Sequence, residues 1–321
     1  MRVEILQAGT GDCIWLSHNK RNVVIDGGKQ ASAILSRYSQ LPSDESIDLL
    51  VITHIDSDHI AGVIGLVETM MRNGDLNRLK QVWFNFPKKE ETEEYSISEG
   101  NKLSSLLCHI EGLNWCNNTS LLLGNPIHIG DIKLNVIAPN HDVAEDYLLE
   151  KPEELSYYNA DWDDDLKILI ENVDDDDIDD SCPNSQSIVI IVECEGKKAL
   201  FPGDCTPKEL CSAIQSYKRI TGTHLKLDLM KLPHHGSLRN ITKELLSEID
   251  CSNFIVSTNV NMKYGFPHKE AIAKLISYRN EAAETVNVFF NYKEAHDVLG
   301  LTEEEQAENN LKLTVSHEFC V

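Results

Sequence analysis

The sequence predicts an α/β fold in which two β-sheets pack face to face between outer layers of helices. Three observations predict it: hairpins alternate with strand–helix units, several apolar runs are short and rich in Val and Ile, and segments of helical spacing follow those runs. The 321 residues are 41% hydrophobic, so the chain is able to bury a large core.

The first half of the chain is expected to contain a three-stranded meander followed by strand–helix units. Strands are predicted at 3–6, 13–17, 22–26, 47–53 and 80–86, and helices at 32–41 and 59–72. The run 47–53 is apolar almost throughout, which is typical of a strand buried on both faces. Residues 88–120 are polar and partly helical in pattern.

The second half is expected to contain two hairpins and three further helices. The hairpins span 127–139 and 187–204, strands follow at 227–232 and 253–258, and helices at 208–220, 241–249 and 268–280. The runs 286–290 and 311–319 look like a terminal strand pair. We therefore predict one domain over 1–321, with an acidic insertion at 141–180 and a C-terminal strand extension at 281–321.

Most of the negative charge lies in one stretch, residues 141–180, called the acidic segment below. The chain has a net charge of −23, of which the acidic segment carries −15 and the remainder −8. This balance excludes a protein that coats duplex nucleic acid and disfavours one that binds an anionic membrane surface. Long acidic segments are usually solvated, but the apolar run 166–170 and nearby aromatic residues predict that part of this one folds, as a flap over a site.

The remaining composition favours a cytoplasmic protein. There is no run of about 18 apolar residues that could span a membrane, and the first 18 residues predict a strand and turn rather than a secretory signal. Nine scattered cysteines without a CxxC pair indicate reduced thiols.

The strongest chemical signal is the segment Thr53–His59, which follows an apolar strand and precedes a helix. It offers four potential metal ligands in six residues: His54, Asp56, Asp58 and His59. Side chains at the end of a strand can converge on one point. Mixed imidazole and carboxylate ligands suit two divalent ions, with Zn²⁺ and Mn²⁺ as candidates.

Two later predicted strands are also followed by potential metal ligands. Gly203 is followed by Asp204, and His234-His235-Gly236-Ser237 follows the strand near 230. A weaker fragment places His268 at the start of a helix. Three strand ends that offer His or Asp together indicate a metal site.

These fragments resemble the metallo-β-lactamase superfamily, and more closely the hydrolase domain of the ComEC competence proteins. The matching fragments run in order from the start of the chain to about residue 275: LQAGTGDCIWL, VVIDGG, VITHIDSDHIAGV, NSQSIVIIV, LFPGDC, LMKLPHHGS and YGFPHKEAIAKL. The resemblance implies a four-layer αββα sandwich, in agreement with the predicted elements.

The resemblance also implies roles for individual residues. His54 and Asp56 would bind one metal, Asp58 and His59 a second, and Asp204 would bridge them; either His234 or His235 would complete the set. Asp26 would orient a ligand from outside the ligand shell, although an Asp before two glycines is equally typical of a turn.

Two departures from the family pattern bear on the chemistry. Asp56 stands where the superfamily commonly has His, and no His with a suitable strand before it lies between the first motif and Asp204. An oxygen-rich site leaves Mn²⁺ open beside Zn²⁺ and argues against β-lactam substrates.

The expected activity is metal-dependent hydrolysis of a phosphodiester, in a nucleic acid or nucleotide, with Asp58 or Asp204 as proton acceptor. Lys231, Ser237 and His268 are candidates for substrate contacts, as are Arg239, Lys263 and Lys269. Two alternatives stay open: a small-molecule ester, thioester, amide or phosphorylcholine-type hydrolase, and a non-catalytic protein that binds a basic protein partner through the acidic segment.

Overall fold

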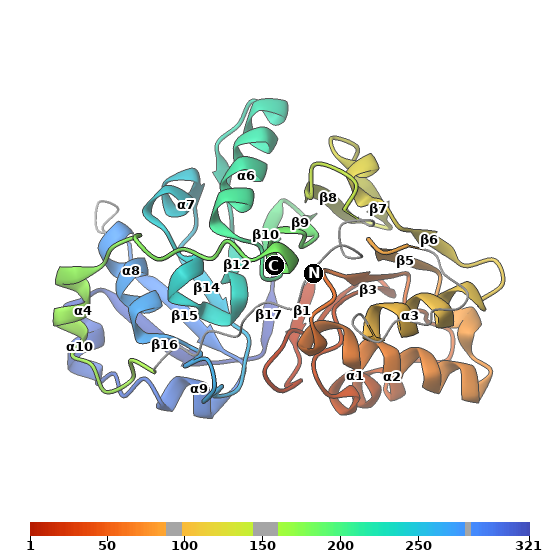
Figure 1. Ribbon diagram of the computed structural model, residues 1–321, viewed down its shortest axis with the longest axis horizontal. Coiled ribbons are helices and arrows are strands. Elements are labelled where there is room, and N and C mark those ends of the chain that lie inside the picture. Colours follow the sequence, from red (N-terminus) through yellow and green to blue (C-terminus); the bar gives the residue numbers. More distant parts are fainter. Residues whose placement is uncertain (88–97, 144–159, 280–283) are drawn as a thin grey trace.

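Two large sheets lie face to face with helices on both outer sides in the computed structural model, which describes residues 1–87, 98–143, 160–279 and 284–321 (Figure 1). The first sheet has the order β17 (Glu318–Cys320), β1 (Arg2–Ile5), β2 (Ile14–His18), β3 (Arg21–Ile25), β4 (Leu49–Ile52), β5 (Gln81–Phe84) and β6 (Asn114–Cys116). The second has the order β16 (Leu311–Val315), β15 (Val286–Phe290), β14 (Asn253–Val256), β12 (Leu229–Lys231), β10 (Lys197–Phe201), β9 (Val189–Cys194), β8 (Ile132–Ala138) and β7 (Ile127–Ile129). A short pair, β11 (Leu225–Lys226) and β13 (Ile249–Asp250), lies apart from both.

The helices form the two outer layers. Those on the first sheet are α1 (Ala31–Ser39), α2 (Ser57–Asn73) and α3 (Ser98–Cys108), and those on the second include α6 (Pro207–Thr221), α7 (Lys243–Glu248) and α8 (Lys269–Arg279). The remaining helices are α4 (Leu166–Asn172), α5 (Cys182–Ser185), α9 (Lys293–Asp297) and α10 (Glu303–Glu308).

Strand β4 shows how the sequence produces these layers. Leu49 and Val51 belong to the core between the sheets, whereas Leu50 and Ile52 belong to the core under α1–α3. Alternate side chains of a strand point to opposite faces, so a strand covered on both faces must be apolar at every position. Three separate apolar cores therefore make four layers, and the predicted αββα sandwich is confirmed.

Most predicted elements are present with small shifts at their ends, and the hairpin turn at Glu195-Gly196 has positive φ at both residues. The predicted strand 311–319 is wrong as one element. Its first part, β16, runs parallel to β15, whereas residues 318–320 cross to the other sheet and pair with β1. Strand β6 lies in a segment whose polar pattern predicted helix, and α9 and α10 separate β15 from β16.

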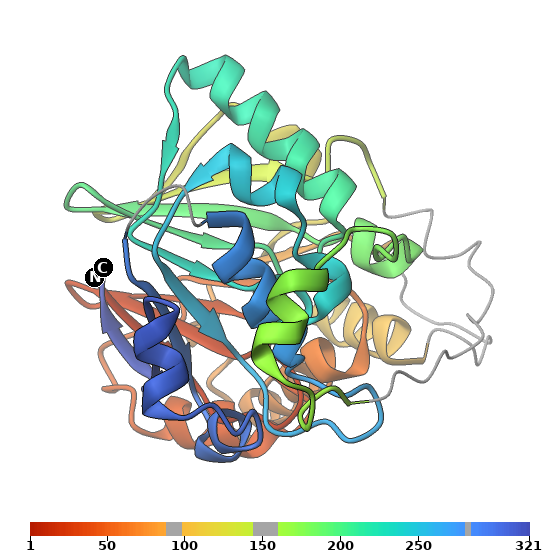
Figure 2. The same ribbon diagram turned by 90° about the vertical axis from the view of Figure 1, so that its left-hand side faces the viewer.

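Residues 160–180 of the acidic segment are folded onto the second sheet's helices. Leu166 is buried, and Trp162, Leu169 and Ile170 pack against the same core as α8. Figure 2 shows α4 lying against α8. Residues 144–159, the rest of the predicted flap, lie outside the described residues.

Among the helices that the structure describes, none has the length and apolarity needed to cross a lipid bilayer.

Candidate metal centre

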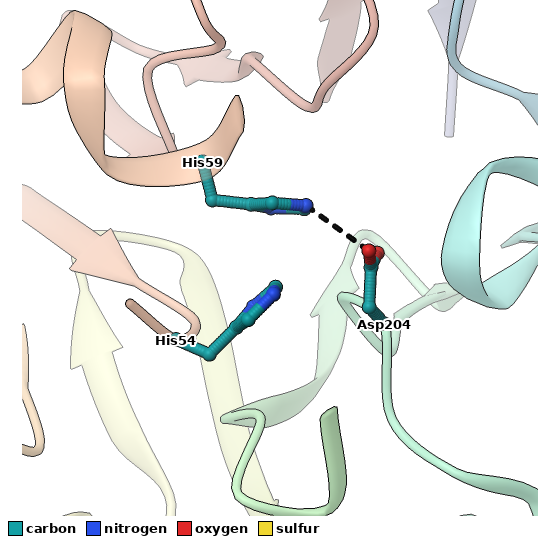
Figure 3. A group of neighbouring side chains, drawn as sticks. All are labelled: His54, His59 and Asp204. Atoms are coloured by element: carbon teal, nitrogen blue, oxygen red, sulfur yellow. Dashed lines mark hydrogen bonds and ion pairs between the residues drawn. The ribbon is translucent and has the colours of Figure 1, made fainter. Parts of the chain in front are cut away.

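The loops after β4, β10 and β12 converge at one edge of the two sheets, where the sequence predicted a metal site. Four overlapping groups there place one ligand atom per residue within 4.8 Å of one another: His54, His59 and Asp204; Asp58, His59 and His235; Asp12, Asp204 and His235; Asp12, Asp26 and His59. Figure 3 shows the rings of His54 and His59 directed toward the Asp204 carboxylate.

His59 is held by the carboxylate of Asp26, which lies at the end of β3 with no exposed surface. Asp26 Oδ2 accepts a hydrogen bond from His59 Nδ1 at 2.8 Å, and Asp26 Oδ1 accepts one from the backbone N–H of Thr53 at 2.8 Å. With its proton fixed on Nδ1, His59 presents Nε2 to Asp204 Oδ2, 3.2 Å away. This is the arrangement by which a carboxylate outside the ligand shell orients a metal-binding His.

His54 is oriented through Thr53. The Thr53 hydroxyl donates its proton to Asp26 Oδ2 at 2.7 Å, so the same oxygen accepts from His54 Nδ1 at 3.0 Å. His54 Nε2 is buried and makes no hydrogen bond within the described ranges. A buried, unpaired nitrogen is costly unless a ligand occupies it.

Asp56 and Asp58 lie at the first turn of α2. Asp56 is the N-cap residue, but its carboxylate makes no capping hydrogen bond, and Asp56 Oδ2 instead lies 3.6 Å from His54 Nε2. Asp58 Oδ2 lies 3.6 Å from His235 Nε2. The two carboxylates therefore face different histidines, as the two-metal assignment expects.

The His pair after β12 has an unusual backbone. His234 and His235 both have positive φ, 48° and 57°, followed by Gly236 at 81°. This region costs a residue with a side chain roughly 1–3 kcal/mol, and outside ordinary turns such residues cluster at functional sites. The twist brings both rings toward Asp204, with His235 Nε2 at 3.2 Å and His234 Nε2 at 3.9 Å from Asp204 Oδ2.

His235 has the geometry of a ligand, and it is the more buried of the pair. Its Nδ1 donates to the carbonyl oxygen of Ser257 at 2.9 Å, and its Nε2 makes no hydrogen bond to any residue that the structure describes. The His234 side chain is 26% exposed, against 2% for His235.

The electrostatics of the centre depend on its buried opposite charges. Burial alone would raise the pKa of Asp204, but His235 and His59 outweigh it and hold that pKa well below its usual range. Burial likewise disfavours charged His235, yet Asp204 raises its pKa to about 9. The metal-free centre therefore holds protons that divalent ions would displace.

Lys231 does not fit the predicted contact with substrate. Its side chain is fully buried, and its Nζ lies 2.6 Å from Asp12 Oδ2 and 3.3 Å from Asp204 Oδ1. Lys231 therefore supports Asp204 from the protein interior. It binds Oδ1 of Asp204 and leaves Oδ2 to face the histidines.

The other proposed substrate contacts are also occupied. Ser237 is 2% exposed and caps the backbone N–H of Arg239, and His268 is 1% exposed and accepts from the backbone N–H of Leu238. Arg239 pairs with Asp177, and Lys269 Nζ donates to the carbonyl oxygen of Asp164. Lys263 is exposed and contacts Tyr264. Two of these basic side chains, Arg239 and Lys269, thus bind residues of the acidic segment.

Sequence reasoning missed several residues of the centre: Asp12, Thr53, Asp179, Asn240 and Ser257. Asp12 and Thr53 had a usable signal, because both lie in fragments that resemble the family. The others are ordinary loop residues, and their roles follow from tertiary contacts.

The residues present fit divalent metal ions. The buried Nε2 atoms of His54 and His235 make no hydrogen bond in the described part of the chain, and both lie in groups that contain Asp204. Imidazole nitrogen and carboxylate oxygen together form a typical ligand set for such ions.

Comparisons with known proteins show which family and which proteins this chain is similar to. A model of the metallo-β-lactamase superfamily matches residues 6–95. ComE operon protein 3 of Bacillus subtilis (strain 168) is 20% identical over 294 residues, which cover 85% of this chain and 30% of that protein. Recombination protein 2 of Haemophilus influenzae is 29% identical over 102 residues, 32% of this chain and 12% of that protein. The chain thus spans less than a third of the length of these relatives.

Two solved structures show a general likeness. Zn²⁺-bound PqqB from Methylobacterium extorquens has a TM-score of 0.48 at 11% identity, and the match covers 100% of each chain. The metallo-β-lactamase fold protein YhfI from Bacillus subtilis has a TM-score of 0.46 at 10% identity and covers 99% of this chain and 98% of its own. The family model over residues 6–95, the long alignment with the Bacillus protein and the αββα layers support a likeness of this chain to the metallo-β-lactamase superfamily.

Proposed function

We propose that this chain is a dinuclear metal-dependent hydrolase that cleaves phosphodiesters, with Mn²⁺ or Zn²⁺ as the ions. The observation that carries the proposal is the convergence of histidine and carboxylate side chains on Asp204 Oδ2, which lies 3.2 Å from both His59 Nε2 and His235 Nε2. The mixed ligands and the resemblance to the ComEC hydrolase domain support a phosphodiester substrate.

The metals and the protein have separate tasks in this proposal. Two divalent ions supply Lewis-acid activation of water and neutralise charge on a phosphoryl group. The protein holds the ligands in one geometry through Asp26, Thr53 and Ser257, which fix the proton of each imidazole on Nδ1. The ligand atoms are thereby oriented before an ion binds.

Asp58 is a better proton acceptor than Asp204. Both oxygens of Asp204 are engaged, one by Lys231 and the other by the histidines, and its side chain is 3% exposed. The Asp58 side chain is 26% exposed and lies at the open side of the centre. Asp58 can therefore take a proton from water and release it to solvent.

The alternative hypothesis, that the acidic segment binds a basic protein partner, has less support. In residues 160–180, Asp161 caps α8, Asp175 binds the Lys243 backbone, and Asp177 pairs with Arg239. These carboxylates are used within the chain. No specific observation favours a basic protein partner over hydrolysis.

The proposal is tested with the full chain, loaded with Mn²⁺ or Zn²⁺, against bis-p-nitrophenyl phosphate, single-stranded DNA and RNA. Asp58→Asn should lower turnover by about 10²–10⁴-fold, the range of a lost acid–base group, and His59→Ala should lower turnover because it removes a proposed metal ligand. Asp44→Asn and His317→Ala, at exposed positions, are the matched controls and should keep full turnover. Absence of turnover with two ions bound, or hydrolysis of small esters or amides alone, would overturn it.

A further inference from the structure

We infer that the acidic segment builds part of the metal centre: Asp179 is the positioning residue of His234, and His234 ligates the ion that His54 and Asp56 bind. On this inference both members of the His pair are ligands, one for each ion. It rests on the dinuclear centre of the proposed function.

Asp179 is buried, although it lies in a mostly exposed acidic run. It is 2% exposed, and its backbone N–H donates to the carbonyl oxygen of Arg239 at 3.1 Å. Its Oδ2 accepts from Asn184 Nδ2 at 2.8 Å and from Asn240 Nδ2 at 2.9 Å, and its Oδ1 accepts from the backbone N–H of Ser181. The carboxylate is therefore fixed in one orientation.

This fixed carboxylate faces His234. His234 Nδ1 lies 3.3 Å from Asp179 Oδ2 and 3.2 Å from Asn240 Oδ1, two acceptors. The Asn184 amide, 3.4 Å from the same nitrogen, already donates to Asp179. The proton of His234 is thus held on Nδ1, and Nε2 presents its lone pair on the side of Asp204.

The same arrangement recurs in the other three histidines of the centre. His59, His54 and His235 each donate Nδ1–H to a fixed acceptor and direct Nε2 to the site. His234 repeats this pattern with an acceptor from the acidic segment. If His234 were only a polar loop residue, it would not need the buried carboxylate of Asp179 next to its Nδ1 atom.

Counting ligands assigns His234 to an ion. Asp58, His59, His235 and Asp204 already provide four ligand side chains for one ion. The His54 side offers Asp56 and Asp204, which makes three, one fewer than the four side chains counted for the other ion. The sequence lacks the superfamily's further His before Asp204, and the ordered match there, Asn184, touches His234 instead. His234 fills the missing position.

The test measures ion stoichiometry and affinity by equilibrium dialysis with Mn²⁺ and, separately, Zn²⁺, without an activity readout. The wild-type chain should bind two ions. His234→Ala should lose one of them, and Asp179→Ala should weaken one by about 10–100-fold, as removal of such a supporting carboxylate does. Asp179→Asn keeps an acceptor oxygen and should be weakened less than Asp179→Ala.

Asp177→Asn is the matched control, since Asp177 lies two residues away and pairs with Arg239. It should bind two ions with wild-type affinity. Thermal unfolding of each metal-free variant shows whether the fold is retained, and only folded variants are compared.

Two tightly bound ions in folded His234→Ala, or unchanged affinities in Asp179→Ala, would overturn the inference, as would a wild-type chain that binds one ion. A wild-type chain that binds two ions through His234 but cleaves no phosphodiester would refute the proposed function and leave this inference standing.

Discussion

Lys231 and Asp12 form a buried ion pair beneath the metal centre, with 2.6 Å between Lys231 Nζ and Asp12 Oδ2. Burial disfavours the charged lysine, but Asp12 and Asp204 outweigh it and raise the pKa of Lys231. Asp12 also lies 3.5 Å from His235 Nδ1. The pair thus links β12, the His pair and the loop after β1.

Breaking this pair should destabilise the protein strongly. Lys231→Met leaves Asp12 buried without its main partner, and removal of one partner of a buried pair costs about 3–5 kcal/mol. Urea denaturation of the metal-free chain measures the change. Lys20→Met, which breaks an exposed pair with Asp44, is the control and should hardly shift the midpoint. A Lys231→Met midpoint equal to that of the control would contradict the role given to the pair.

Asp26→Asn should weaken metal binding while leaving the ligands in place. Asp26 accepts hydrogen bonds through both oxygens, and in the amide one oxygen is replaced by a donor NH2 group. Either the Thr53 backbone N–H, or His59 Nδ1 together with the Thr53 hydroxyl, therefore loses its acceptor. We expect a loss of about 10–100-fold in affinity, measured by competition with a chelator. Asp48→Asn, which removes a carboxylate bound to Arg21 and Asn22, should show no loss. Equal affinities in the two variants would refute the orienting role of Asp26.

Metal binding should release protons and strengthen as pH rises. The pKa of His235 in the metal-free centre is about 9, above its ordinary value near 6.5, so at pH 7 His235 is charged and must lose its Nε2 proton to bind an ion. Affinity should therefore climb as pH rises toward about 9 and level off above. Calorimetry in buffers of different ionisation enthalpy counts the released protons; no proton release at pH 7 would contradict the charged state of His235.

The stability of the metal-free fold should change with pH in the opposite direction to the metal affinity: it should fall as pH rises. Because the folded pKa of His235 is raised, its charge stabilises the metal-free fold fully below about pH 6.5, and this contribution is lost as pH rises through about 9. Bound ions should replace it. At a free-ion concentration 100 times the dissociation constant, each site should add about 2.7 kcal/mol, seen as a higher unfolding temperature that chelator reverses.

The sequence predicted the layers and the convergence of His and Asp side chains because both depend on local patterns. The largely apolar run 47–53 is typical of a strand covered on both faces, and Thr53–His59 places His and Asp side chains at the end of that strand. The crossing of residues 318–320 to the first sheet has no such pattern, because it depends on the open edge of β1.

The roles of Lys231 and Asp179 were also beyond sequence reasoning. From the sequence, Lys231 is indistinguishable from a surface lysine, and only the fold places it between the carboxylates of Asp12 and Asp204. Asp179 is one of many acidic residues in its segment, and only the fold brings Asn240 into contact with it. Both depend on contacts between segments far apart in the chain.

The proposed centre requires two ions that share Asp204. Anomalous diffraction from crystals of the full chain grown with Mn²⁺ locates these ions. We expect two peaks about 3.5–4 Å apart on either side of Asp204 Oδ2, one beside Asp58, His59 and His235 and the other beside His54 and Asp56. A single peak, or none within coordination distance of Asp204, would contradict it.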